Sequence, residues 1–238
     1  MSHTLNRREF IGTGAAVAAS GSLVFGFPTQ AAAQGAAPEI TAWVVVQPDD
    51  KVVIRIARSE MGQGTLTGLA QLVAEELDCD WARVTTEYPT PGQNLARKRV
   101  WGNFSTGGSR GIRESHDYVR KGGAAARMML VQAAADEWKV PAAECQATGK
   151  GVIEHAASKR RTTYGKVAAA AAKLTPPTDV ALRDPKQWHL AGKRMARLDT
   201  VDKTTGKQIY GADLQLPGML NASIRACPVF CGNLKRFD

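Results

Sequence analysis

The residues best suited to chemistry form a short glycine-rich run at positions 60–67 (EMGQGTLT). The run lies between a predicted strand and a predicted helix. Glycine allows a backbone to approach a ligand closely, and N–H groups at a helix start suit an acceptor-rich group. Gln63 offers both a donor and an acceptor. This combination fits a heterocycle with both kinds of edge, such as a pterin, although the bare pattern fits a structural turn equally well.

A second glycine-rich turn occupies positions 105–111 (STGGSRG), just before a predicted long helix. Its hydroxyls, its free N–H groups and the nearby Arg110 and Arg113 suit an anion. Two such loops in one domain could hold two parts of one elongated anionic cofactor. Each loop alone could equally be a connection or a helix cap.

No catalytic constellation or metal-ligand spacing is present, so the sequence predicts no catalytic residue and no metal ligand. The four histidines, His3, His116, His155 and His189, are scattered. Glu75 and Glu76 are expected to form a solvated helix face rather than an acid–base pair.

The elements that must position the two loops alternate between strand and helix periodicity. Strands are predicted at residues 40–47, 51–57, 84–88 and 151–155, the first two as a hairpin turning at Pro48. Helices are predicted at 65–77, 114–138 and 164–174, with a loop at 92–113. Thr65 or Thr67 is expected to cap the first helix, and Met128 and Met129 to face the core. The predicted fold class is α+β.

Composition excludes several classes of protein. The chain has 238 residues, 44% of them hydrophobic and 22% charged, as in an ordinary globular protein. Lys and Arg outnumber Asp and Glu by 31 to 22, which gives a net charge of +9. Aromatic residues are only 6% and no nucleic-acid motif occurs, so a basic solvated surface is expected and no nucleic-acid partner.

The amino terminus has the features of an export signal. A paired Arg7-Arg8 precedes an apolar, small-residue stretch, which ends at Pro28 and the small-residue site at 31–33. Paired arginines are typical of the Tat route, which carries folded proteins. We therefore predict a Tat signal at residues 1–33, cleavage after Ala33 and a periplasmic protein, and a redox cofactor inserted before export.

Export after folding also bears on the cysteines. They are Cys79, Cys145, Cys227 and Cys231. Because they would fold in a reducing compartment, buried free thiols are expected rather than a disulfide framework. A lone C-x3-C pair is too few ligands for a zinc site or a cluster.

Several segments resemble the molybdenum-binding subunits of the xanthine dehydrogenase and aldehyde oxidase family, in particular the exported branch typified by the isoquinoline 1-oxidoreductase beta subunit. They are residues 60–64 (EMGQG), 74–77 (AEEL) with Trp81, 107–109 (GGS), the helix positions Arg120, Gly123, Ala124, Ala126 and Arg127, and 182–185 (LRDP). Residues 197–213 and 216–220 resemble the start of that branch's next module, the a/b hammerhead domain.

The resemblance implies a division into residues 1–33 (Tat signal), 34–177 (molybdopterin-binding segment), 178–194 (linker) and 195–238 (start of a hammerhead domain). It also implies a cofactor site. The residues that it assigns to cofactor binding are Met61, Gly62, Gln63, Gly64, Thr65 and Thr67, with Gly108 and Ser109 in the second loop.

The family's reaction hydroxylates an aldehyde or an N-heterocycle, with water as the oxygen source. The resemblance therefore implies a molybdenum–molybdopterin cofactor in its cytosine dinucleotide form. It also implies a separate [2Fe-2S] small subunit and electron transfer onward to cytochrome c.

The chain departs from the family pattern in two respects. The family's catalytic glutamate lies downstream of the matching segments, and Phe230-Cys231-Gly232 stands where the family has Phe-Gly-Gly. The sequence is therefore expected to be the amino-terminal part of a molybdenum subunit, inactive alone and completed by the remaining part. The alternative is a non-catalytic binding module completed by a second chain. The substrate is not readable from these residues.

Overall fold

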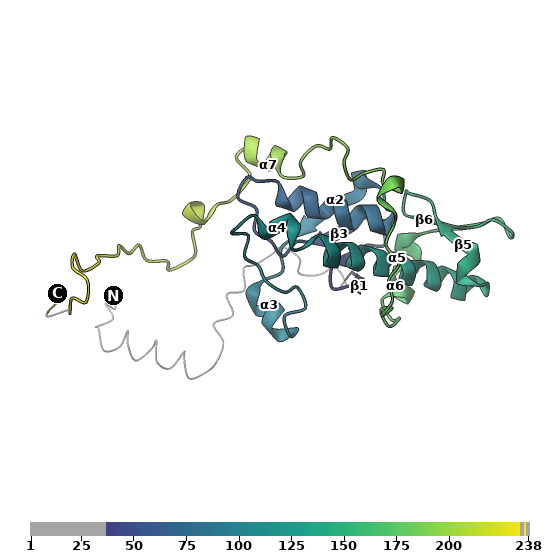
Figure 1. Ribbon diagram of the computed structural model, residues 1–238, viewed down its shortest axis with the longest axis horizontal. Helices are drawn as coiled ribbons and strands as arrows, with labels where there is room; N and C mark the ends of the chain where they lie inside the picture. Colours follow the sequence, from purple (N-terminus) through teal and green to yellow (C-terminus); the bar gives the residue numbers. More distant parts are fainter. Residues whose placement is uncertain (1–36, 234–235, 237–238) are drawn as a thin grey trace. The chain divides into compact units, whose positions relative to one another are not determined.

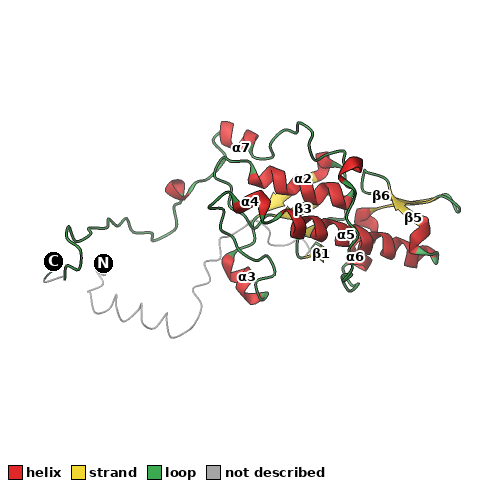
Figure 2. Ribbon diagram, viewed as in Figure 1, coloured by secondary structure: helices red, strands yellow, loops and turns green. Residues whose placement is uncertain are grey.

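The structure is a computed structural model that describes residues 37–233 and residue 236. The predicted signal at residues 1–33 therefore lies outside the described residues. The chain divides into two compact units, the first ending at Leu198 and the second beginning at Asp199. The first unit contains both helices and strands, which confirms the predicted α+β class (Figures 1 and 2).

A four-stranded sheet forms the frame of the first unit. Its strands are β1 (Glu39–Thr41), β2 (Val44–Val46), β3 (Val52–Arg55) and β4 (Val84–Glu87), in the order β1-β2-β3-β4. The first three strands are antiparallel, whereas β4 runs parallel to β3. The predicted return strand at 51–57 and the strand at 84–88 are confirmed within these bounds.

The prediction of one continuous strand at 40–47 is wrong, because Ala42 and Trp43 turn the chain between β1 and β2. Tertiary contacts hold this turn. The Ala42 carbonyl accepts a hydrogen bond from the Trp101 indole at 2.7 Å. Trp43 lies against Gly122, where an added Cβ would come within 2.6 Å of its ring. The β-branched composition predicts extended backbone but does not reveal these partners.

Two long helices pack against each other. Helix α2 (Thr65–Leu77) connects β3 to the parallel β4, and α5 (His116–Trp138) lies alongside it (Figure 1). Both helices agree with the prediction within two residues. At Gly123 an added Cβ would come 2.5 Å from the Val73 carbonyl oxygen, so the small residues of α5 do admit another backbone, as predicted.

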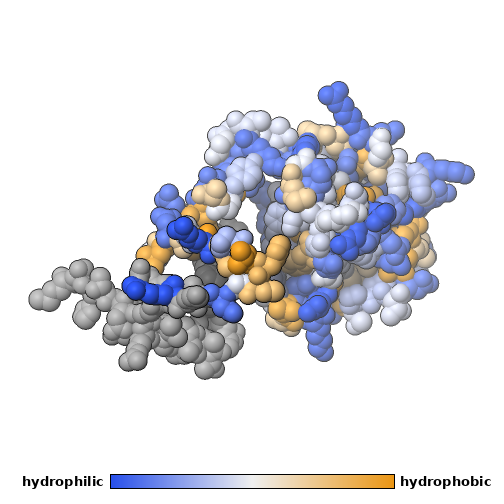
Figure 3. Space-filling view, turned by 60° about the vertical axis from the view of Figure 1, so that its left-hand side comes forward, coloured by the Kyte–Doolittle hydropathy of each residue, from blue (hydrophilic) through white to orange (hydrophobic). Residues whose placement is uncertain are grey.

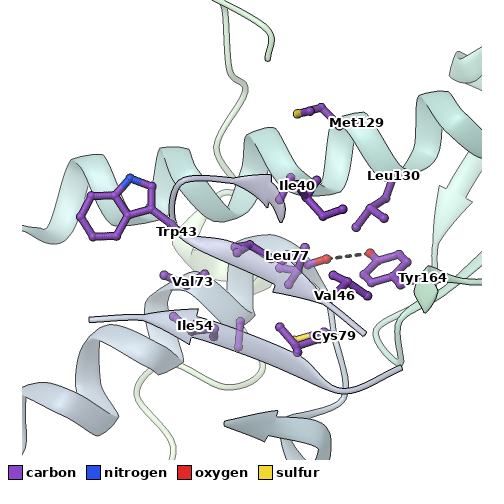
Figure 4. Close-up of a cluster of buried hydrophobic side chains, with 14 of the residues drawn as sticks. Ile40, Trp43, Val46, Ile54, Val73, Leu77, Cys79, Met129, Leu130 and Tyr164 are labelled. Atoms are coloured by element: carbon purple, nitrogen blue, oxygen red, sulfur yellow. Dashed lines mark hydrogen bonds between the residues drawn. The ribbon is translucent and has the colours of Figure 1, made fainter. Parts of the chain in front are cut away.

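The core lies between the sheet and these helices (Figure 4). Ile54, Leu77 and Leu130 are fully buried, and the Tyr164 hydroxyl donates to the Leu77 carbonyl at 2.7 Å. Met129 is buried as predicted. Met128 is 37% exposed, so its placement in the core was wrong; one step along a helix turns a side chain by about 100°, away from the packed face.

A small antiparallel sheet closes the other end of the unit. It contains β5 (Cys145–Ala147), β6 (Val152–His155) and β7 (Arg160–Thr163), followed by α6 (Tyr164–Ala171). The predicted strand at 151–155 and helix at 164–174 are confirmed, the helix ending earlier. The expected loop at 92–113 contains two short helices, α3 (Pro91–Ala96) and α4 (Arg110–Arg113).

The second unit differs from the prediction. Strands were expected at 208–214 and 220–225, but residues 199–233 contain α7 (Thr200–Thr204), a 3-10 turn at Gly211–Asp213 and no strand. Ile209, Leu220 and Ile224 are 69%, 82% and 98% exposed. Two isolated strands without a packing surface are marginal in water, which is the physical reason for the difference. The assignment of 195–238 to a hammerhead domain stays a prediction.

Hydrophilic residues cover much of the face shown in Figure 3, with hydrophobic residues between them. Within the described residues, no helix combines the length and the hydrophobicity that a bilayer crossing requires.

Candidate functional site

The first predicted loop connects β3 to α2 and presents its backbone to solvent. Gly62 and Gly64 have φ values of +102° and +87°, which favour glycine. An added Cβ at either position would meet nothing within 4 Å, so the space beside the backbone is open. Met61 is 72% exposed. The loop thus has room for a ligand to approach its main chain.

Glu60 organises this loop from within. Its side chain is only 6% exposed. One carboxylate oxygen accepts the N–H groups of Gly62 at 2.7 Å and Gly64 at 3.0 Å, and the other accepts that of Leu66 at 3.0 Å. Gly64 is the N-cap of α2 and no threonine caps the helix, so that prediction was wrong. The threonines lie inside the helix, whereas the carboxylate reaches its N-terminus from the preceding loop.

Arg197 joins the same cluster from far along the chain. Its guanidinium lies 3.1 Å from the Glu60 carboxylate and donates to the Gly62 carbonyl at 2.9 Å. Burial alone would raise the pKa of Glu60. The N–H donors of Gly64, Leu66 and Gly62 and the charge of Arg197 outweigh it, so the pKa lies below the ordinary 4.5. Glu60 is therefore an ionised structural group at neutral pH.

Gln63 connects the two predicted loops. Its side-chain oxygen accepts the Met61 N–H at 2.5 Å. Its amide nitrogen donates to the Ser59 carbonyl at 2.9 Å and to the Thr106 hydroxyl at 3.1 Å. The structure thus brings together two runs that are more than forty residues apart. A direct bond from the Gln63 amide to a ligand requires the exchange of one of these partners.

The second loop also exposes its backbone. Gly108 and Ser109 have left-handed φ values of +65° and +55°, and both are exposed. Arg110 donates to the Gly107 carbonyl at 3.0 Å, and Arg113 to that of Gly108 at 3.4 Å. Among the described residues, no acceptor lies within hydrogen-bond distance of the N–H groups of Gly107 and Gly108.

Sequence reasoning missed Arg58, a buried residue that fastens the loops together. Its side chain is 3% exposed and donates to the Ser115 hydroxyl at 2.9 Å and to the Ser105 carbonyl. Its guanidinium also lies 3.5 Å from Glu114. Arg58 therefore ties the start of the first loop to both ends of the second. The available signal was a charged residue directly after a buried apolar strand.

Two of the predicted contact residues lie inside the protein. Thr65 and Thr67 are 3% and 6% exposed. An added Cβ on Gly111 would come 2.9 Å from the Thr65 hydroxyl, so this threonine packs against the second loop. The Thr67 hydroxyl accepts the Leu198 N–H at 3.1 Å. Both threonines position the start of α2 beneath the exposed residues 61–64.

The expectation that Glu75 and Glu76 face solvent was wrong, since both side chains are fully buried. Glu75 accepts the backbone N–H groups of three consecutive residues, 189–191, at 2.6–3.1 Å. Glu76 pairs with Arg120 at 2.7 Å and accepts the Arg183 N–H at 3.0 Å. These carboxylates anchor the segment 183–191 against α2 and hold the helix that carries the first loop.

Side-chain metal ligation is not indicated. Among the described residues, no three His, Cys, Asp or Glu side chains are grouped to hold a metal ion. His155 is buried between Ser158, at 2.6 Å, and Glu144, at 2.9 Å.

The cysteines are all free. Cys79 and Cys145 are buried, as expected, whereas Cys227 and Cys231 are exposed.

The donor set of the two loops fits an elongated organic cofactor. Glycines with positive φ leave open space beside the first loop, and unpaired N–H groups and two arginines line the second. A heterocycle with donor and acceptor edges suits the former, and an anionic end suits the latter.

This α+β frame with two bridged glycine loops defines a class of domain that holds a cofactor by main-chain edges. The family model of the molybdopterin cofactor-binding domain matches residues 2–212, and the chain belongs to that family.

Curated relatives are similar over most of this chain. The beta subunit of the isoquinoline 1-oxidoreductase of Brevundimonas diminuta is 34% identical over 266 residues, which cover 94% of this chain and 34% of the relative. A membrane-bound aldehyde dehydrogenase (pyrroloquinoline-quinone) of Gluconacetobacter polyoxogenes is 28% identical and covers 98% and 31%. A subunit of the nicotinate dehydrogenase of Pseudomonas putida is 27% identical and covers 83% and 16%. The chain spans about a third of the length of the first two.

Solved structures give a weaker likeness. Quinoline 2-oxidoreductase from Pseudomonas putida 86 has a TM-score of 0.40 at 21% identity, covering 58% of this chain and 17% of that one. CO dehydrogenase from Oligotropha carboxidovorans has a TM-score of 0.39 at 20% identity, covering 53% and 15%.

Proposed function

We propose that this chain supplies part of the molybdenum-cofactor site of a hydroxylase that oxidises aldehydes or N-heterocycles. The supporting observation is the bridge from Gln63 to Thr106, which joins two exposed glycine loops into one surface. Membership of the molybdopterin-binding family and the names of the relatives support the reaction class.

Each loop has a separate task in this proposal. The backbone of residues 61–64 holds the pterin, and Gly108 and Ser109 contact another part of the cofactor. Thr65 and Thr67 act from beneath by fixing the start of α2. When bound, the cofactor supplies oxygen transfer to the substrate carbon and accepts two electrons. The chain's own residues bind and orient it.

The remaining components belong to the same proposal. The cofactor is the cytosine dinucleotide form, and electrons pass to a separate [2Fe-2S] small subunit and then to cytochrome c. The catalytic glutamate lies in the remaining part of the molybdenum subunit, since this chain matches only about a third of its relatives' length.

We further propose export to the periplasm by the Tat pathway, on the Arg7-Arg8 pattern. Replacing both arginines by lysine in a fusion of residues 1–40 to a folded reporter should keep the reporter in the cytoplasm, because Lys does not reproduce the guanidinium geometry. Periplasmic reporter from the double-lysine fusion would refute this route.

Cofactor content tests the central proposal. The chain is co-produced with the remaining part of the subunit and the small subunit, and molybdenum and pterin are measured per protein. Gln63→Ala should lower both, because the loops lose their bridge. Gly62→Val should lower both further, since its side chain would enter the open space beside the loop. Glu154→Ala, in an exposed ion pair of the second sheet, is the control.

Two results would contradict the proposal. One is unchanged molybdenum in both loop variants. The other is quinone without molybdenum in the unaltered protein, the cofactor named for one relative.

A further inference from the structure

The N-terminus of α2 is closed to anions by the protein itself. A helix of 13 residues carries a partial positive charge and unpaired N–H groups at its start, which ordinarily attract a phosphate. Here the Glu60 carboxylate already accepts the N–H groups of Gly62, Gly64 and Leu66. A second anion would lose these donors and would meet a negative charge.

We propose that Glu60 is a positioning residue that sets the direction of the bound cofactor, with the neutral heterocycle against loop 60–64 and the phosphate end at loop 105–111. This inference rests on the proposed function for the identity of the cofactor. The exclusion of anions from α2 depends only on the geometry of this chain.

The charges around the two loops support this direction. At the first loop, the nearby Arg197 is matched by Glu60, so the cluster carries no net charge. At the second loop, three arginines, Arg58, Arg110 and Arg113, face one glutamate, Glu114. The unpaired N–H groups of Gly107 and Gly108 add further donors there. The excess positive charge therefore lies at the second loop.

Arg197 makes the arrangement depend on the chain's own fold. It holds Glu60 in place and also donates to the Gly62 carbonyl, so the segment before Leu198 fastens the loop. Removing Arg197 should loosen the loop but leave the carboxylate at the helix start. Removing Glu60 should free the helix start for an anion.

Inorganic phosphate is the probe, with amide hydrogen exchange of the full chain as the readout. In the unaltered protein, phosphate should slow exchange in loop 105–111 and leave the amides of residues 62–66 unaffected. In Glu60→Ala these amides should exchange about tenfold faster without phosphate, because they lose bonds to a charged group. Added phosphate should then slow them. The controls are Glu154→Ala and Arg161→Met, which break an exposed ion pair in the second sheet.

Phosphate protection of residues 62–66 in the unaltered protein would overturn the proposal, as would its absence from loop 105–111. If Glu60→Ala fails to fold, Arg197→Met decides. It should speed exchange at Gly62 while phosphate still leaves residues 62–66 unprotected, and protection there would refute the role of Glu60. Because the readout needs no cofactor, a chain without molybdenum but with this phosphate pattern would refute the proposed function alone.

Discussion

Replacing Arg120 by methionine should destabilise the first unit severely, because it leaves a buried charge without its partner. The guanidinium lies 2.7 Å from the Glu76 carboxylate, which has no exposed surface. It also donates to the Arg183 carbonyl at 2.9 Å and stacks on Trp188 at 4.9 Å. Methionine keeps much of the aliphatic stem, so the change mainly removes the charge and its hydrogen bonds.

The size of the effect follows from burial. Removing one partner of a buried ion pair costs about 3–5 kcal/mol, which for a unit of this size lowers the Tm by about 6–20 °C. The Arg183 N–H remains bonded to Glu76 and does not neutralise it. The matched control, Arg161→Met, breaks a pair in which the arginine side chain is 67% exposed, and should cost at most about 1 kcal/mol.

Thermal unfolding followed by circular dichroism measures both variants. The double variant Arg120→Met with Glu76→Met should recover most of the loss, because an apolar pair of similar volume replaces the ion pair. A Tm for Arg120→Met equal to that of the control would refute the reasoning. A double variant less stable than Arg120→Met would show that packing, rather than the unpaired charge, dominates.

Three further predictions concern other parts of the chain. Glu60→Gln should cost about 1–3 kcal/mol at neutral pH. The folded pKa is lowered, so this difference should persist above pH 4.5 and vanish as pH falls through the folded pKa, in a Tm series against pH. Gly123→Ala should lower the Tm by pushing α5 from the Val73 carbonyl, whereas Gly211→Ala, with open space around it, should not; equal Tm values would count against close packing. A thiol reagent should modify Cys227 and Cys231 in the native protein and the other two cysteines only after unfolding, since burial raises their thiol pKa; four rapid native thiols would contradict this.

Local patterns were sufficient for the elements that frame the site. Helices α2 and α5 and the hairpin of β2 and β3 repeat their apolar residues with the period of their own structure, so neighbours in sequence carry the signal. The positive φ at Gly62 and Gly108 also belongs to glycine itself. Both loops could therefore be recognised before their geometry was known.

Partners distant in sequence decided the rest. The burial of Glu75 and Glu76 depends on residues more than a hundred positions downstream, which offer N–H groups and counter-charge that no local pattern reveals. The turn at Trp43 depends on a glycine of α5 for the same reason.

The sequence by itself determined the α+β class, the two glycine-rich loops and the family that they resemble, because these are properties of residue type and short-range periodicity. Only the tertiary structure decided that Gln63 bridges the loops and that Glu60 fills the start of α2. A carboxylate in a polar loop is equally compatible with solvent, a ligand or the protein's own backbone. The choice depends on donors brought within 3 Å by the packing of α2 and by Arg197.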